Sequence, residues 1–202
     1  AGSRSVKTLS ASPLARGLFN KAVIMSGSGL ADPRKQAEVS AYMKPLAPLT
    51  MEEAAAQIKE VADWANMKDI QQLRRAGTET IYALGTLYTS VTGKRSPLTA
   101  MPVSPYIDGY VLPESFDDAC IDGTLAEVPY MIGYTLNDMG NMKEQIADFG
   151  LNREEMGGVA YTYQFARPLP DDGKHPEITR SLKGAFHSSD LWYVFKSLKH
   201  CR

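Results

Sequence analysis

The chain of 202 residues carries 22 basic and 23 acidic side chains, a formal net charge of −1, and 44% of its residues are apolar. This composition excludes a disordered chain, and one domain with a large apolar core is the default expectation. The balanced charge excludes the basic footprint of a nucleic-acid binder, and no apolar stretch approaches the ~18 residues that a membrane span requires.

The two cysteines, Cys120 and Cys201, allow one disulfide at most. We see no signal-peptide pattern in the sequence. Because the sequence opens on Ala1 rather than on methionine, a secreted and a cytoplasmic location both stay open.

The first predicted elements are a helix and a strand. Apolar residues recur at helical spacing in the first 19 residues, and Ser12-Pro13 is expected to stop that helix. The apolar run at residues 21–25 is closed by Ser26-Gly27-Ser28-Gly29. That pattern predicts a buried strand that ends in a turn.

The middle of the chain is predicted to be helical. Thr50-Met51-Glu52-Glu53 has the pattern of a capping box and predicts a helix that ends near Asn66. Shorter helices are predicted over residues 69–73 and 78–84, each capped by its first residue. We interpret residues 31–100 as a helical crossover or a cap over a site.

Two further strands and a last helix complete the pattern. Residues 128–133 are apolar, and residues 160–165 are aromatic and rich in strand formers, so both predict buried strands. Residues 188–198 place apolar side chains on one face of a helix. Strands that alternate with helices over this length favour an α/β sheet.

Two side chains stand where a sheet of this kind presents its sites. Asp138 follows the strand predicted at 128–133, and loops past the carboxyl ends of strands hold sites in open α/β sheets. His187 follows Gly184-Ala185-Phe186 and precedes the last predicted helix. Judged by this context alone, a structural role is favoured for both residues over a catalytic one.

The remaining motifs point to no other chemistry. His175 and His200 lie among charged residues and are expected to be solvated. No metal-ligand spacing, dinucleotide-binding fingerprint or phosphate loop occurs, so no cofactor or metal is predicted. A complete G-x-S-x-G elbow is also absent, since Ser26 stands where the first glycine would precede Ser28.

Short blocks spread along most of the chain carry the argument further. They are Ala1-Gly2-x-x-Ser5-Val6, Ser12-Pro13, Gly17-Leu18-Phe19, and residues 22–28, 105–109, 112–113, 128–133, 161–165 and 184–195. In this order they resemble the type B carboxylesterases, the family that includes the cholinesterases. The last block, which contains His187, is the most specific.

The resemblance implies an α/β-hydrolase fold whose triad runs serine, acid, histidine along the chain. The family's elbow reads Gly-Glu-Ser-Ala-Gly, and Ala1-Gly2 matches its last two residues. The nucleophilic serine is therefore expected immediately before Ala1, whose N–H would serve the oxyanion hole. Residues 1–202 would then form an incomplete domain, the second half of the sheet with flanking helices, and the N-terminal half of that domain would be their partner.

The same resemblance assigns roles to three residues of this chain. His187 matches the catalytic base, and Asp138 matches the acid, where the family usually carries glutamate. Because aspartate is one methylene shorter, its loop must approach His187 more closely. Ser26 matches a serine that lies near the acid in relatives, so we expect it to support Asp138 through a hydrogen bond.

The function implied by the resemblance is that of a carboxylesterase, a serine hydrolase that cleaves small-molecule carboxylic esters through an acyl-serine intermediate. The 202 residues alone are expected to be inactive, because His187 has no serine to deprotonate. The alternative is a catalytically dead esterase-like domain used for binding or adhesion. A residue other than serine before Ala1 would favour that alternative.

Overall fold

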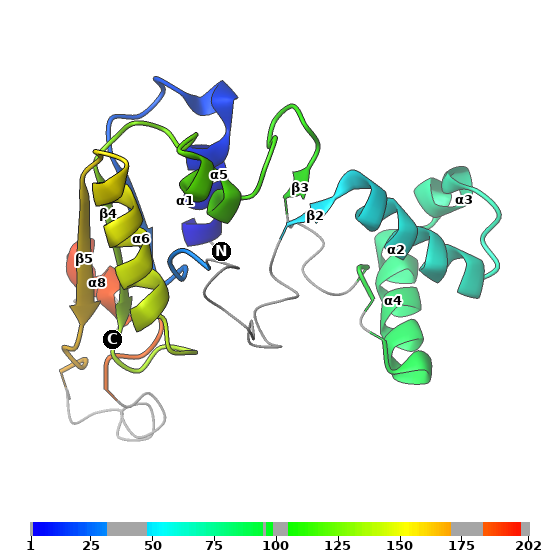
Figure 1. The fold of residues 1–202 in the computed structure, drawn as a ribbon. Helices are drawn as coiled ribbons and strands as arrows, with labels where there is room; N and C mark the ends of the chain where they lie inside the picture. Colours follow the sequence, from blue (N-terminus) through cyan, green and yellow to red (C-terminus); the bar gives the residue numbers. More distant parts are fainter. Residues whose placement is uncertain (1, 32–47, 95, 99–104, 171–183, 199–202) are drawn as a thin grey trace. The chain divides into compact units, whose positions relative to one another are not determined.

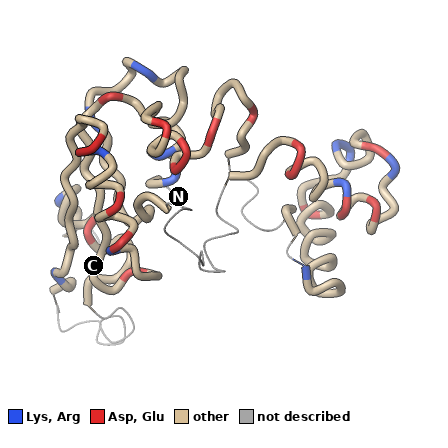
Figure 2. Tube along the Cα trace, viewed as in Figure 1, with Lys and Arg blue, Asp and Glu red and all other residues tan. Residues whose placement is uncertain are grey.

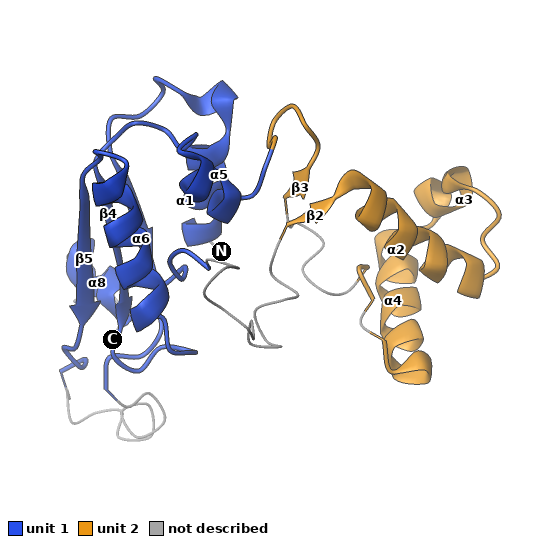
Figure 3. Cartoon of the chain, viewed as in Figure 1, with its two compact units in different colours: residues 1–39, 114–202 blue, residues 40–113 orange. Residues whose placement is uncertain are grey.

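The computed structural model of the chain describes residues 2–31, 48–94, 96–98, 105–170 and 184–198. The chain forms two compact units, one of residues 1–39 and 114–202 and the other of residues 40–113 (Figure 3). Figure 2 shows basic and acidic residues mixed in both units. Among the described helices, none is long and apolar enough to cross a bilayer.

The first unit is built on a parallel sheet in the order β1-β4-β5, as the α/β prediction requires (Figure 1). Its strands are β1 (Ala22–Met25), β4 (Tyr130–Thr135) and β5 (Ala160–Phe165). Ile24 lies opposite Ile132 in the register, and both side chains are completely buried. The predicted strands are therefore confirmed, the third with the predicted bounds. The burial predicted for that third strand is wrong, because β5 lies at the edge of the described sheet and none of its six residues is fully buried.

Helices cover one face of this sheet. Helix α1 (Gly2–Ala11) packs on β1, and α6 (Lys143–Glu155) connects β4 to β5 and packs on both strands. The helix α5 (Phe116–Asp122) contacts α1 and α6. Phe149 of α6 is completely buried and stacks on Phe116 at 5.6 Å, with the ring of Tyr130 edge-on at 5.5 Å. This aromatic cluster joins the helical layer to the sheet.

The opposite face of the sheet carries an exposed apolar row. Val23, Met131 and Tyr161 are neighbours across the three strands and are 47%, 45% and 61% exposed. Nearer the carboxyl ends of the strands, α8 (Ser189–Val194) reaches this sheet, where Tyr193 packs on Phe165 at 5.2 Å. Strands of parallel sheets are typically buried on both faces, so this row has the character of a packing surface.

The described part of the second unit contains a short parallel pair, β2 (Leu49–Thr50) with β3 (Tyr106–Ile107), and three helices. Helix α2 (Met51–Trp64) starts at the predicted capping box, in which Glu53 N donates to Thr50 Oγ1 at 3.1 Å. Helix α3 (Ile70–Arg75) is capped by Asp69, as predicted.

Helix α4 (Thr78–Thr92) corrects the prediction for residues 78–84. Its N-cap is Gly77, with no side-chain cap, and the helix runs through the buried Gly85. Packing explains the extension, because Tyr88 in the next turn is 3% exposed and meets Trp64 edge-on at 5.5 Å. The helix ends at Gly93, whose φ of 69° is left-handed.

The last helix, in contrast, is shorter than predicted. Its N-cap, Ser188, has a left-handed φ of 71° and makes no capping bond with its side chain. Val194 and Phe195 are 59% and 70% exposed, so the apolar face expected for residues 188–198 is not buried within the described part of the chain.

Candidate active site

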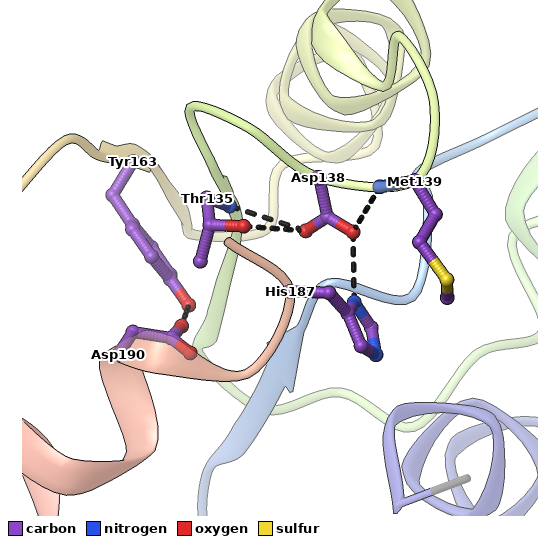
Figure 4. Close-up of polar contacts among 6 residues, drawn as sticks. All are labelled: Thr135, Asp138, Met139, Tyr163, His187 and Asp190. Atoms are coloured by element: carbon purple, nitrogen blue, oxygen red, sulfur yellow. Dashed lines mark hydrogen bonds and ion pairs between the residues drawn. The ribbon is translucent and has the colours of Figure 1, made fainter. Parts of the chain in front are cut away.

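The loop after β4 fixes the carboxylate of Asp138. Its Oδ2 accepts hydrogen bonds from Thr135 Oγ1 at 2.9 Å and Thr135 N at 3.3 Å, and its Oδ1 accepts one from Met139 N at 2.8 Å (Figure 4). The side chain of Asp138 is completely buried. Residues adjacent in the sequence therefore hold both oxygens of the carboxylate.

His187 meets this carboxylate from a distant part of the sequence. Its Nδ1 lies 2.7 Å from Asp138 Oδ1, and its side chain is 33% exposed. A carboxylate can only accept, so the proton of the hydrogen bond belongs to Nδ1 of His187. In the neutral ring Nε2 is then an acceptor, and Figure 4 shows it pointing away from Asp138.

The environment keeps Asp138 charged. Burial acts to raise the pKa of its carboxyl, but the Ser26 hydroxyl, the Met139 amide, His187 and Thr135 together outweigh it, and the pKa lies below its usual value. A charged acid at this position can orient an imidazole and stabilise its protonated form.

The two other predicted site residues are Ser26 and Ala1. Ser26 follows β1, is 8% exposed and has a left-handed φ of 54°. Its Oγ is buried and makes no hydrogen bond of normal geometry among the described residues. The Ser26 hydroxyl nevertheless helps to lower the pKa of Asp138 and so favours the charged form of that carboxyl. Ala1, the predicted oxyanion donor, lies outside the described residues, as do His175, His200 and Cys201. Cys120 is buried and free.

Sequence reasoning missed the residue beside the acid. Asn137 N donates to Ala185 O at 2.9 Å, and Ala185 N donates to Asn137 Oδ1 at 3.0 Å. It also missed that Tyr163 on β5 donates to the buried carboxylate of Asp190 at 3.2 Å (Figure 4). No signal in a single sequence identifies either contact, since each joins segments that are far apart along the chain.

Within the described residues, no cluster of three His, Cys, Asp or Glu side chains could hold a metal ion. The site consists of an acid and a base brought together at the carboxyl ends of the strands, which is where open α/β sheets place their sites.

The family relationship is decided by a sequence match. Residues 1–155, out of 202, match the carboxylesterase family. The chain belongs to the carboxylesterase family. The matched segment includes Asp138 and ends before His187, so the position of this histidine beside the acid is information that the structure adds.

Individual carboxylesterases match nearly all of the chain. It is 27% identical over 190 residues to the para-nitrobenzyl esterase of Bacillus subtilis. This match covers 93% of the present chain and 34% of the Bacillus protein. The structure of the Geobacillus stearothermophilus carboxylesterase EST55 matches 96% of the chain with a TM-score of 0.59 and 18% identity. A thermophilic pNB esterase matches 98% with a TM-score of 0.61 and 17% identity.

These likenesses show that the chain has the α/β-hydrolase fold in part. The chain spans 46% of the two solved carboxylesterase structures and 34% of the Bacillus protein. The prediction of an incomplete α/β-hydrolase domain of this family is thereby confirmed.

The lowered pKa of Asp138 predicts how acid affects stability. A group whose pKa is depressed in the folded state stabilises the fold above its unfolded pKa and loses that contribution as the pH falls through the folded pKa. We expect the urea midpoint of the intact protein to fall as the pH drops below about 4, and Asp138→Asn to reduce that fall. Asp122→Asn, at the exposed end of α5, is the matched control. An equal acid dependence in all three proteins would contradict the assignment.

Proposed function

We propose that the intact polypeptide containing this chain hydrolyses carboxylic esters through a Ser-Asp-His triad. The observation that carries the proposal is the 2.7 Å contact between His187 Nδ1 and the buried Asp138 Oδ1. Membership of the carboxylesterase family and the names of its relatives, a para-nitrobenzyl esterase and a carboxylesterase, support ester hydrolysis as the reaction class.

The chemistry follows from the protonation of the pair. With Nδ1–H donating to Asp138, His187 Nε2 is free to take the proton of a serine hydroxyl as its oxygen attacks the ester carbonyl. The imidazolium then returns the proton to the departing alcohol, which leaves an acyl-serine. Water deprotonated by His187 attacks this intermediate, releases the carboxylic acid and regenerates the serine. Asp138 stabilises the imidazolium both when the acyl-serine forms and when it is hydrolysed.

The serine belongs immediately before residue 1 in the intact polypeptide. A nucleophile elbow requires a helix directly after the nucleophile, and α1 begins at Gly2. The order serine, Asp138, His187 is also the chain order of α/β-hydrolases. In this arrangement the N–H of Ala1 contributes to the oxyanion hole, and Ser26 supports the acid.

The turn after β1 ties α1 to the acid side of the site. Lys7 Nζ donates to Gly29 O at 2.8 Å, and a Cβ at Gly27 would lie 2.5 Å from the Cβ of Ser3. This close packing gives α1 a fixed position relative to the turn that carries Ser26. A nucleophile at the start of α1 would therefore be held by the same turn that borders Asp138.

The remaining assignments concern the rest of the domain. We assign residues 31–100 to a crossover or cap region, which contains helices α2, α3 and α4. The N-terminal half of the domain would complete the sheet and supply the other oxyanion donors. The ligand is a small-molecule ester.

The test is steady-state hydrolysis of p-nitrophenyl acetate by the intact polypeptide, with the 202-residue chain assayed beside it. We expect saturable hydrolysis by the intact protein and none by the shorter chain. A folded intact protein without hydrolytic activity would contradict the proposal and would favour a binding or adhesion domain.

A further inference from the structure

The segment that carries His187 is fastened to the residue next to Asp138. Asn137 and Ala185 exchange two hydrogen bonds, from Asn137 N to Ala185 O at 2.9 Å and from Ala185 N to Asn137 Oδ1 at 3.0 Å. Asn137 also forms an isolated parallel bridge with Phe186. Ala185 is completely buried, so its amide depends on the Asn137 side chain for a partner.

A glycine permits this close approach. Gly184 has a left-handed φ of 68°, and a Cβ at this position would lie 2.0 Å from Asn137 Oδ1. Any larger residue at 184 would therefore push the segment away from Asn137 and would also be strained in this conformation. The contact between Asn137 and Ala185 therefore depends on a glycine at position 184.

The contact joins two parts of the site, the acid loop and the histidine segment, each of which also has an anchor of its own. Asp138 is fixed by Thr135 at the end of β4 and by Met139 in its own loop. Beyond His187, α8 is held to β5 by the Tyr163–Asp190 hydrogen bond. Asn137 is the residue that joins the segment before His187 directly to the acid loop.

We propose that Asn137 is a positioning residue that holds His187 at hydrogen-bond distance from Asp138. The short aspartate requires the histidine segment to come close, and the Asn137–Ala185 pair provides that approach two residues before His187. The inference rests on the proposed function for its catalytic consequence. The geometric part concerns the acid–histidine contact alone.

The experiment compares variants of the intact polypeptide. Asn137→Leu removes the acceptor for Ala185 N, and Asn137→Gln keeps an amide but lengthens the side chain. Asn137→Asp keeps an acceptor at the same distance. Asn141→Ala is the matched control, because Asn141 lies in the same loop and its Oδ1 accepts from Lys143 N, a residue of the loop's own side of the site.

Two readouts are needed. Kinetics of p-nitrophenyl acetate hydrolysis should show kcat lowered about tenfold or more in Asn137→Leu and Asn137→Gln with KM little changed, since displacement of a catalytic group acts on the chemical step. Proton NMR with ¹⁵N-labelled histidine should show the Nδ1–H of His187 hydrogen-bonded far downfield, and this signal should weaken in the same two variants. Asn137→Asp and Asn141→Ala should keep both rate and signal.

The outcomes separate the two proposals. If the unmodified protein hydrolyses no ester, the proposed function fails, while the NMR signal still tests the role of Asn137. If Asn137→Leu does not fold, the pair Asn137→Gln and Asn137→Asp decides. The inference is overturned if Asn137→Gln keeps the signal and the rate, or if Asn141→Ala loses them equally.

Discussion

Replacing His187 with alanine in the intact polypeptide is expected to lower kcat for ester hydrolysis by about 10⁴-fold or more, with KM nearly unchanged. The variant lacks the only group that the site offers, among the described residues, to take the serine proton, because Asp138 is held in its own loop and faces the Nδ1 side of the ring. Steady-state kinetics with p-nitrophenyl acetate measures the loss.

The control for this result is His175→Ala, since the sequence predicts His175 to be a solvated residue without a role in the site. That variant should hydrolyse the ester like the unmodified protein. Retention of activity in His187→Ala would mean that another base serves the serine and would remove the mechanism proposed for this chain.

The second large effect is expected for Asp138→Asn, which should lower kcat by about 10⁴-fold while leaving the fold intact. The amide can take the place of the carboxylate but turns an NH₂ group or a neutral oxygen toward His187. The wrong tautomer, with the proton on Nε2, then becomes favoured, and the imidazolium loses its counter-charge. Kinetics beside a circular dichroism spectrum would separate this effect from unfolding.

A longer acid at the same position tests the geometry itself. Asp138→Glu supplies the residue that the family usually carries, but the side chain here is completely buried and already contacts Thr135, Met139 and His187. An added methylene has no room, so activity should fall, although less than in Asp138→Asn. Higher activity in Asp138→Glu would show that the loop is not adapted to aspartate.

The elements that the sequence predicted well are those whose signals are local. The capping box at Thr50 and the cap at Asp69 each lie within four residues, and both appear in the structure. The aromatic run at Ala160–Phe165 forms a strand with the predicted bounds. Such patterns depend on neighbours in sequence, so no tertiary contact is needed to interpret them.

Helix α6 was missed because its buried face is not purely apolar. Asn152 and Arg153 are 7% and 3% exposed, and the Arg153 guanidinium lies over the ring of Tyr130 at 5.3 Å. A charged side chain that is buried through a cation–π contact hides the helical periodicity on which prediction depends. Tertiary packing likewise explains why α4 continues past Gly85, although the sequence predicted that the helix ends at residue 84.

For the site, context along the chain did not indicate that the two residues meet. It favoured structural roles for Asp138 and His187, and the resemblance to carboxylesterases pointed to the pair instead. The structure brings the two side chains together across 49 residues. Asn137 could not be found in advance, because its role depends on a contact with Ala185 that exists only once the segments are folded.

The most direct test of the account is the site at which a fluorophosphonate labels the intact polypeptide, determined by peptide mass spectrometry. We predict one adduct, on a serine immediately before residue 1, formed rapidly by the unmodified protein and much more slowly by His187→Ala. The absence of an adduct there, or labelling of a different residue with the same dependence on His187, would contradict the claim that Asp138 and His187 serve that serine.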